Sequence, residues 1–174
     1  MKYVIAFAIA WLLAIANVSA LSYIKVLDVT PEFLLIFAAC WAVVRGETEA
    51  LIIVPMAGLL RDLTTSDPLG TSVLAFVPIV FFAAAARQQV IDSDFPPAVA
   101  VVAGSSLAFG IIQSIVLATA GQHMEVGQVT LRVIVPSTLV NALFTPIVYL
   151  PIRWTKPRRL TGLQGSRRLV STLN

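Results

Sequence analysis

The sequence predicts an all-α integral membrane protein, a polytopic bundle of six transmembrane helices, with five as the alternative. Of its 174 residues, 58% are hydrophobic and only 12% are charged, whereas soluble domains carry about 25% charged residues because their surface faces water. At roughly 20 apolar residues per crossing, the apolar runs leave room for five or six spans and no soluble domain. We predict a single transmembrane helical domain over residues 1–152 and a basic cytoplasmic tail over residues 153–174.

The first apolar run covers residues 3–22 and ends near a Val-Ser-Ala sequence, as cleavable secretory signals do. The rest of the chain forms further apolar runs, which need no cleaved signal, so we interpret this run as the first transmembrane helix. Ala6, Ala10 and Ala14 recur at four-residue spacing. Such spacing predicts a small-residue face on which another helix packs closely.

The second and third apolar runs, residues 31–44 and 48–63, are short and meet at a polar step over residues 45–49. To cross a hydrocarbon core of about 30 Å, the third run must carry Arg61 and Asp62 at its far end. It is therefore either a span whose polar end is shielded by protein or one half of a re-entrant hairpin.

A polar turn separates the third run from the fourth, residues 70–87. Asp67 is placed to cap the fourth helix, with Pro68 at its first position, where the missing N–H costs nothing. We expect Gly58 to allow close helix approach, and Gly70 to do the same early in the fourth helix. The last two runs cover residues 96–119 and 129–152.

Arg61 and Asp62 are adjacent in sequence and cannot face each other across one helix turn. We expect each to pair elsewhere, or one of them to point to water. Ionisable groups at membrane depth suggest a function by default, and structural pairing that locks the bundle is the alternative. In the last run, Asn141 is expected to form an interhelical hydrogen bond.

The basic residues predict the orientation, because cytoplasmic loops carry an excess of Lys and Arg. With both termini in the cytoplasm, nine of the 12 basic residues lie inside and three outside. The outside residues are Lys25, Arg61 and Arg132. The tail that follows the last span supplies the whole inside excess, because the count without it is three to three, so the tail decides the orientation. The tail offers two uses, contact with anionic lipid or docking of a cytoplasmic partner. The residues concerned are Arg153, Lys156, Arg158 and Arg159.

Residue types that support catalysis are scarce. The chain has one histidine, His123, in a polar loop, and one cysteine, Cys40, in an apolar run, so an intrachain disulfide and a cysteine cluster are excluded. Phosphate-loop, nucleophile-elbow and paired-histidine motifs are absent, and Asp62 alone lacks a residue that would tune it as an acid or base. We predict no catalytic residues, no cofactor, no metal and no nucleic-acid partner.

One stretch of about 30 residues resembles a known family. It consists of Gly58-Leu59-Leu60-Arg61-Asp62-Leu63, then Ser66-Asp67-Pro68-Leu69-Gly70, a long apolar helix and Arg87. This pattern is similar to the signature region of MreD, the bacterial rod shape-determining membrane protein family. The segment Asn141–Pro146 and the hydropathy layout fit the same family.

The resemblance implies a non-enzymatic scaffold of the cell-wall elongation complex, the elongasome, in the bacterial inner (cytoplasmic) membrane. It implies MreC as direct partner, RodA and a class-B penicillin-binding protein in the same peptidoglycan synthesis machinery, and MreB indirectly. The motif residues would fix the local shape or contact the partner. They are Gly58, Arg61, Asp62, Asp67, Pro68, Leu69 and Gly70.

The MreD fold is also similar to the substrate-binding components of energy-coupling-factor transporters, which have six helices. This likeness supplies an alternative function, a small-molecule-binding membrane subunit of such a transporter. That function needs a cavity between helices, and the sequence offers few residues to line one. The candidates are Trp11, Asn17, Trp41, Gln113, Ser114 and Asn141.

Overall fold

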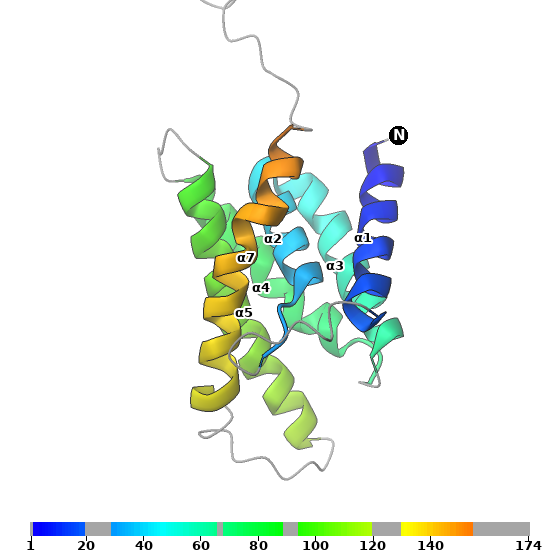
Figure 1. Cartoon of the computed structure of the whole chain (residues 1–174), viewed down its shortest axis with the longest axis vertical. Coiled ribbons are helices and arrows are strands. Elements are labelled where there is room, and N and C mark those ends of the chain that lie inside the picture. The colour runs from blue at the N-terminus through cyan, green and yellow to red at the C-terminus, as the bar shows by residue number, and fades with distance from the viewer. Residues whose placement is uncertain (1, 20–28, 66–67, 89–93, 120–129, 155–174) are drawn as a thin grey trace, which may run out of the picture.

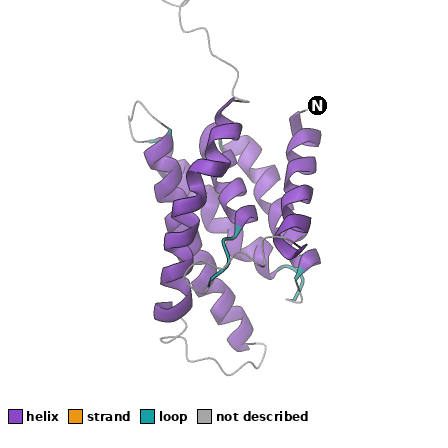
Figure 2. Ribbon diagram, viewed as in Figure 1, coloured by secondary structure: helices purple, strands orange, loops and turns teal. Residues whose placement is uncertain are grey.

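The computed structural model describes residues 2–19, 29–65, 68–88, 94–119 and 130–154. Every regular element within these ranges is helical (Figure 2), which confirms the predicted all-α class. The elements are α1 (Lys2–Ser19), α2 (Phe33–Arg45), α3 (Glu47–Thr64), α4 (Thr71–Arg87), α5 (Phe95–Thr119), the π-helical turn η2 (Thr130–Ile134) and α7 (Val135–Trp154).

Helix lengths distinguish two groups. Two helical stretches, Phe95–Val116 and Arg132–Trp154, are long and apolar enough to cross a membrane by length and composition. Apolar helices over Ala6–Asn17, Phe33–Arg45 and Thr71–Arg87 are shorter. With 13 residues, α2 extends for about 20 Å at 1.5 Å per residue. The fold is compatible with a helical membrane protein, and six crossings stay a prediction.

Helix α2 forms the centre of the bundle. All of its residues from Phe33 to Val44 are buried, and it packs against α1, α3, α4, α5 and α7 (Figure 1). A helix that is apolar on every side is stable only when neighbours or lipid surround it. Its aromatic side chains anchor the core, since the Phe33 ring meets Phe144 of α7 edge-on with centroids 5.5 Å apart.

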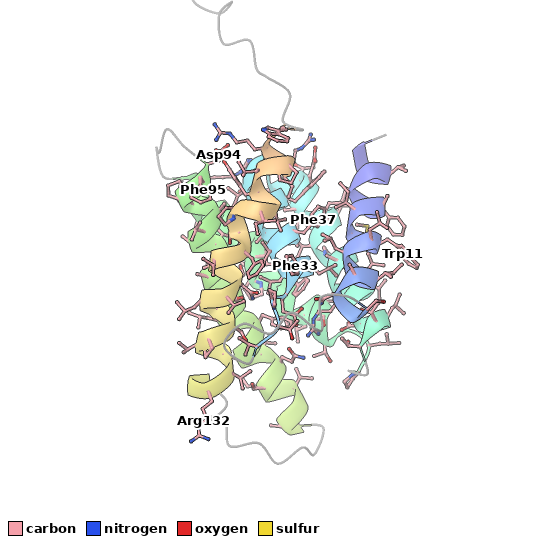
Figure 3. All side chains as sticks on the ribbon, in the orientation of Figure 1. Trp11, Phe33, Phe37, Asp94, Phe95 and Arg132 are labelled. Atoms are coloured by element: carbon pink, nitrogen blue, oxygen red, sulfur yellow. The ribbon has the colours of Figure 1, made fainter. Side chains whose placement is uncertain are left out.

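Helix α1 lies at the edge of the bundle beside α3 (Figure 1), and within the described residues it contacts only α2 and α3. Ala6 and Ala10 are 0% exposed and Ala14 is 3% exposed. The small-residue face of this helix is therefore covered by the chain's own helices. Trp11 lies on the opposite side and points away from the bundle (Figure 3).

Antiparallel packing sets which ends of the helices meet. Gly46 alone connects α2 to α3, so the start of α2 lies beside the end of α3, and α4 begins at the same end. We call this end, drawn at the bottom of Figure 1, the Arg61 end. The opposite end holds the N-terminus of α1 and the last turn of α7, and there Nη2 of Arg87 donates to the carbonyl of Val43 at 3.1 Å.

Candidate functional site

An ion pair between a buried arginine and a partly exposed glutamate lies at the Arg61 end. The Arg61 guanidinium donates two hydrogen bonds to the Glu32 carboxylate, from Nη2 to Oε1 at 2.9 Å and from Nε to Oε2 at 3.2 Å. Residue Arg61 is only 6% exposed, whereas the Glu32 side chain is 22% exposed. Bidentate pairs of this kind are among the strongest polar contacts in proteins. The pair joins the end of α3 to the segment that leads into α2.

Two further contacts surround the guanidinium. Nη1 of Arg61 donates to the Ser72 hydroxyl in the first turn of α4 at 2.8 Å. The guanidinium carbon also lies 4.7 Å from the centre of the Phe109 ring of α5, which adds a cation–π attraction. Arg61 therefore contacts three other parts of the chain, the segment before α2, α4 and α5, and its charge is balanced inside the protein.

The Asp62 carboxylate accepts hydrogen bonds at the start of the next helix, α4. Its Oδ2 accepts the N–H of Gly70 at 2.7 Å, and its Oδ1 accepts the N–H of Ser72 at 3.0 Å. The first N–H groups of a helix have no partner within the helix, and a carboxylate at that end also meets the positive end of the helix dipole. The Asp62 carboxylate, 2% exposed, therefore caps α4 from the end of α3.

Asn141 extends the network to the two long helices. Its Oδ1 accepts the backbone N–H of Glu32 at 2.8 Å, and its Nδ2 donates to the Ser106 hydroxyl of α5. Asn141 is 1% exposed, so both bonds are shielded from solvent. One amide side chain thus links α7, α5 and the segment before α2.

The network consists of Glu32, Arg61, Asp62, Ser72, Ser106 and Asn141. Each member forms at least one hydrogen bond with another member, and connected polar groups of this kind rigidify a fold. Its acidic groups are engaged by an arginine and by backbone N–H groups, and no group of three His, Cys, Asp or Glu among the described residues can hold a metal ion. The arrangement therefore serves to hold the ends of these helices in a fixed geometry.

Gly58 brings α3 and α4 into backbone contact behind the network. A Cβ on Gly58 would lie 2.7 Å from Cα of Val73 and 2.8 Å from its backbone nitrogen. Backbone atoms cannot move aside as the end of a flexible side chain can. The close approach places Ser72 within reach of both Arg61 and Asp62.

We expect Gly58→Ala to lower the free energy of unfolding by about 1–3 kcal/mol, the usual cost of overpacking. Unfolding of both proteins in the same detergent measures the difference. Gly104→Ala is the matched control, because its Cβ would meet the Phe82 ring at an ordinary 3.5 Å. Equal stabilities of the two variants would mean that the α3–α4 contact is looser than the structure indicates.

Comparison with known proteins identifies the family. The family model described as "rod shape-determining protein MreD" matches residues 1–154 of the chain. The chain belongs to the MreD family. This confirms the resemblance seen in the motif and extends it to nearly the whole chain. No curated protein and no solved structure gives a significant match.

Membership of the MreD family establishes a membrane protein with a role in rod shape determination. MreD is a shape-determining family and not a known family of enzymes. Of the motif residues predicted for this MreD protein, the structure brings Gly58, Arg61 and Asp62 into the buried interior. Pro68 and Leu69 lie on the surface, and Leu69 is 73% exposed.

The start of α4 differs from the prediction. The helix begins at Thr71 with Gly70 as its N-cap, so Pro68 precedes the helix and does not occupy its first position. Asp67 lies outside the described residues, and the acceptor for the first N–H groups is Asp62. Asp62 lies in the last turn of α3, so the side chain that caps α4 comes from the preceding helix and not from the turn that joins the two helices.

Gly70 also serves a different purpose from the one predicted. It does not bring two helices together, because a Cβ there would meet nothing within 4 Å. Its φ of 95° lies in the left-handed region, which residues with a side chain adopt only with strain. This conformation turns the Gly70 N–H toward Asp62.

Glu32, Ser72 and Ser106 were missed by the sequence-based prediction. Glu32 carried a usable signal, because it is a charged residue at the edge of an apolar run, and such a residue needs a partner. The two serines carried none, since serine is common in membrane helices. Of the tail residues, Arg153 is exposed at the end of α7. Lys156, Arg158, Arg159 and His123 lie outside the described residues.

Proposed function

We propose that this MreD protein is a non-enzymatic adaptor of the bacterial cell-wall elongation machinery and that it binds MreC. The family match over residues 1–154 carries this proposal. The polar network supports it, because its carboxylates are occupied by structural partners. RodA, a class-B penicillin-binding protein and, indirectly, MreB are the further members of the assembly that we propose.

The division of the motif into buried and exposed residues suggests how MreC is bound. Arg61 and Asp62 face inward and hold the turn between α3 and α4. Leu63 in the last turn of α3 faces outward and is 62% exposed, and Pro68 and Leu69 in the connection to α4 are also exposed. We propose that these three residues, which we call the turn surface, contact MreC. Apolar anchors on a rigid base lose little conformational entropy on binding.

In the proposed topology, the turn surface lies on the periplasmic side of the membrane, the side on which most of MreC is found. With the protein multi-pass in the inner membrane and both termini cytoplasmic, the Arg61 end faces the periplasm. MreC is a single-span protein whose bulk is periplasmic, so it meets the turn surface there. The basic residues Arg153, Lys156, Arg158 and Arg159 then face the cytoplasm, where they contact anionic lipid or a cytoplasmic component.

Replacing Leu69 with lysine tests the turn surface. We expect Leu69→Lys to reduce the recovery of MreC with the affinity-tagged protein in mild detergent by about tenfold, as the loss of an interface anchor does. Trp154→Lys is the matched control, because Trp154 is 82% exposed at the opposite end of the bundle. If MreC is recovered equally with both variants, the turn surface is not the contact, and if the wild type recovers no MreC, the adaptor proposal fails.

A further inference from the structure

A cavity lies beside the network, between α5 and the start of α7. Its volume is about 320 Å³, and Phe109, Val133 and Ile134 form its apolar walls. Its polar walls come from three parts of the chain, the segment before α2, helix α5 and helix α7. The polar side chains that matter here are Glu32, Ser106, Gln113, Ser114, Ser137 and Asn141.

The size and lining of this cavity fit a ligand site. Pockets for small molecules occupy about 300–1,000 Å³ and combine mostly apolar walls with a few fixed polar groups. Since one water molecule takes about 30 Å³ of liquid, the space equals roughly ten waters. One wall is formed by η2, and π-helical turns occur frequently at functional sites.

The polar groups that line the cavity retain hydrogen-bonding capacity. Asn141 is held in one orientation by Glu32 and Ser106, so Ser106 accepts one bond and can still donate its own proton. The Ser137 hydroxyl is half-buried and forms no hydrogen bond with any described residue. A carboxylate has about four acceptor positions, and Arg61 occupies two of those on Glu32. Donors and acceptors are therefore both available.

The charges that surround the cavity select for a neutral molecule. Glu32 is the charged group among the described residues that line it, and Arg61 balances it from behind. An anion would lose its hydration without gaining a cationic partner, because Arg61 is already bound to the Glu32 carboxylate. A cation would lose its hydration next to a carboxylate that is already neutralised, and burial of an unpaired charge is costly.

We propose that this cavity binds a neutral, water-soluble small molecule with hydroxyl or amide groups on one side and apolar carbon on the other. The molecule enters at the Arg61 end. Its polar side meets Ser106, Ser137 and Asn141, and its carbon face lies against Phe109 and Ile134. The binding of this molecule is independent of the adaptor role, so each can fail without the other.

Cysteine labelling tests which molecules enter the cavity. The probes are hydroxyethyl methanethiosulfonate, which is neutral, and its anionic sulfonatoethyl analogue, both of which form a disulfide with a thiolate and release methanesulfinate. Cys40→Ala removes the native thiol, Ser137→Cys places one in the cavity, and Leu69→Cys provides an exposed reference. We expect the ratio of neutral to anionic labelling rates to be about tenfold higher at Ser137→Cys than at Leu69→Cys, because the anion must shed water beside Glu32. Equal ratios would overturn the proposal.

Native mass spectrometry of the full chain, purified from bacterial membranes in mild detergent, tests occupancy. We expect a bound neutral small molecule in the wild type and in Leu139→Phe, whose site on α7 is 60% exposed. Ser137→Phe fills the cavity and should lose that molecule. Retention in Ser137→Phe, a bound phospholipid in place of a soluble molecule, or no bound mass in any of the three proteins would each overturn the proposal.

Discussion

Arg61→Leu is expected to lower the free energy of unfolding by about 3–5 kcal/mol, the range for breaking a buried ion pair by removing one partner. The substitution leaves the Glu32 carboxylate without its cation and removes the hydrogen bond to Ser72. Because Glu32 is partly exposed, water offsets some of this cost, and we expect a value near the lower end. Chemical unfolding in detergent micelles measures it.

The double variant Glu32→Leu/Arg61→Leu isolates the ion pair. Removing both partners of a buried pair is often nearly neutral, because no uncompensated charge remains. We therefore expect the double variant to regain most of the stability that Arg61→Leu loses. The stability of Glu32→Leu alone completes the comparison. If the losses of Glu32→Leu and Arg61→Leu simply add up to the loss of the double variant, the two residues do not interact, and the ion-pair geometry is wrong.

Asp62→Ala is expected to lower the free energy of unfolding by about 1–3 kcal/mol, the cost of one buried donor left without an acceptor. That donor is the N–H of Ser72, because Gly70 lies on the surface, where water replaces the lost acceptor. The loss should be greatest in the first turn of α4. Hydrogen exchange should show faster exchange at Ser72 in the variant, with little change at the far end of the helix.

Two controls accompany the Asp62 substitution. Asp62→Asn keeps the shape and one acceptor oxygen, so it should lose less stability than Asp62→Ala. Leu63→Ala changes an exposed neighbour on the same turn and should leave hydrogen exchange in α4 unchanged. Faster exchange in α4 after Leu63→Ala would mean that the turn as a whole, and not the carboxylate, holds the helix start.

The helices were predictable because hydropathy alone defines them. The observed bounds differ from the apolar runs by a few residues, as between 48–63 and Glu47–Thr64. The burial of α2 on every side was not predictable in the same way. An apolar run has the same hydropathy whether lipid or protein surrounds the helix. The sequence therefore cannot predict that α2 lies at the centre of the bundle and α1 at its edge.

The site was partly predictable. Arg61 and Asp62 stood out as charges in an apolar context, but their partners depend on tertiary contacts. Glu32 lies 29 residues from Arg61 in sequence, and the two meet because α2 and α3 run antiparallel. Local capping rules pointed to Asp67, whereas the tertiary fold supplied Asp62. Asn141 could be assigned an interhelical bond from its polarity, but its acceptors could not be named.

Recovery of MreC with network variants tests most directly whether the network positions the turn surface that we propose binds MreC. Tagged wild type, Asp62→Ala, Gly70→Leu and His123→Ala are purified in mild detergent, and the MreC that accompanies each is quantified. We predict stoichiometric MreC with the wild type and His123→Ala, and strongly reduced MreC with Asp62→Ala and Gly70→Leu, because both disturb the turn before α4. Equal recovery with all four proteins would contradict the account, as would recovery of ATP-binding-cassette subunits in place of MreC.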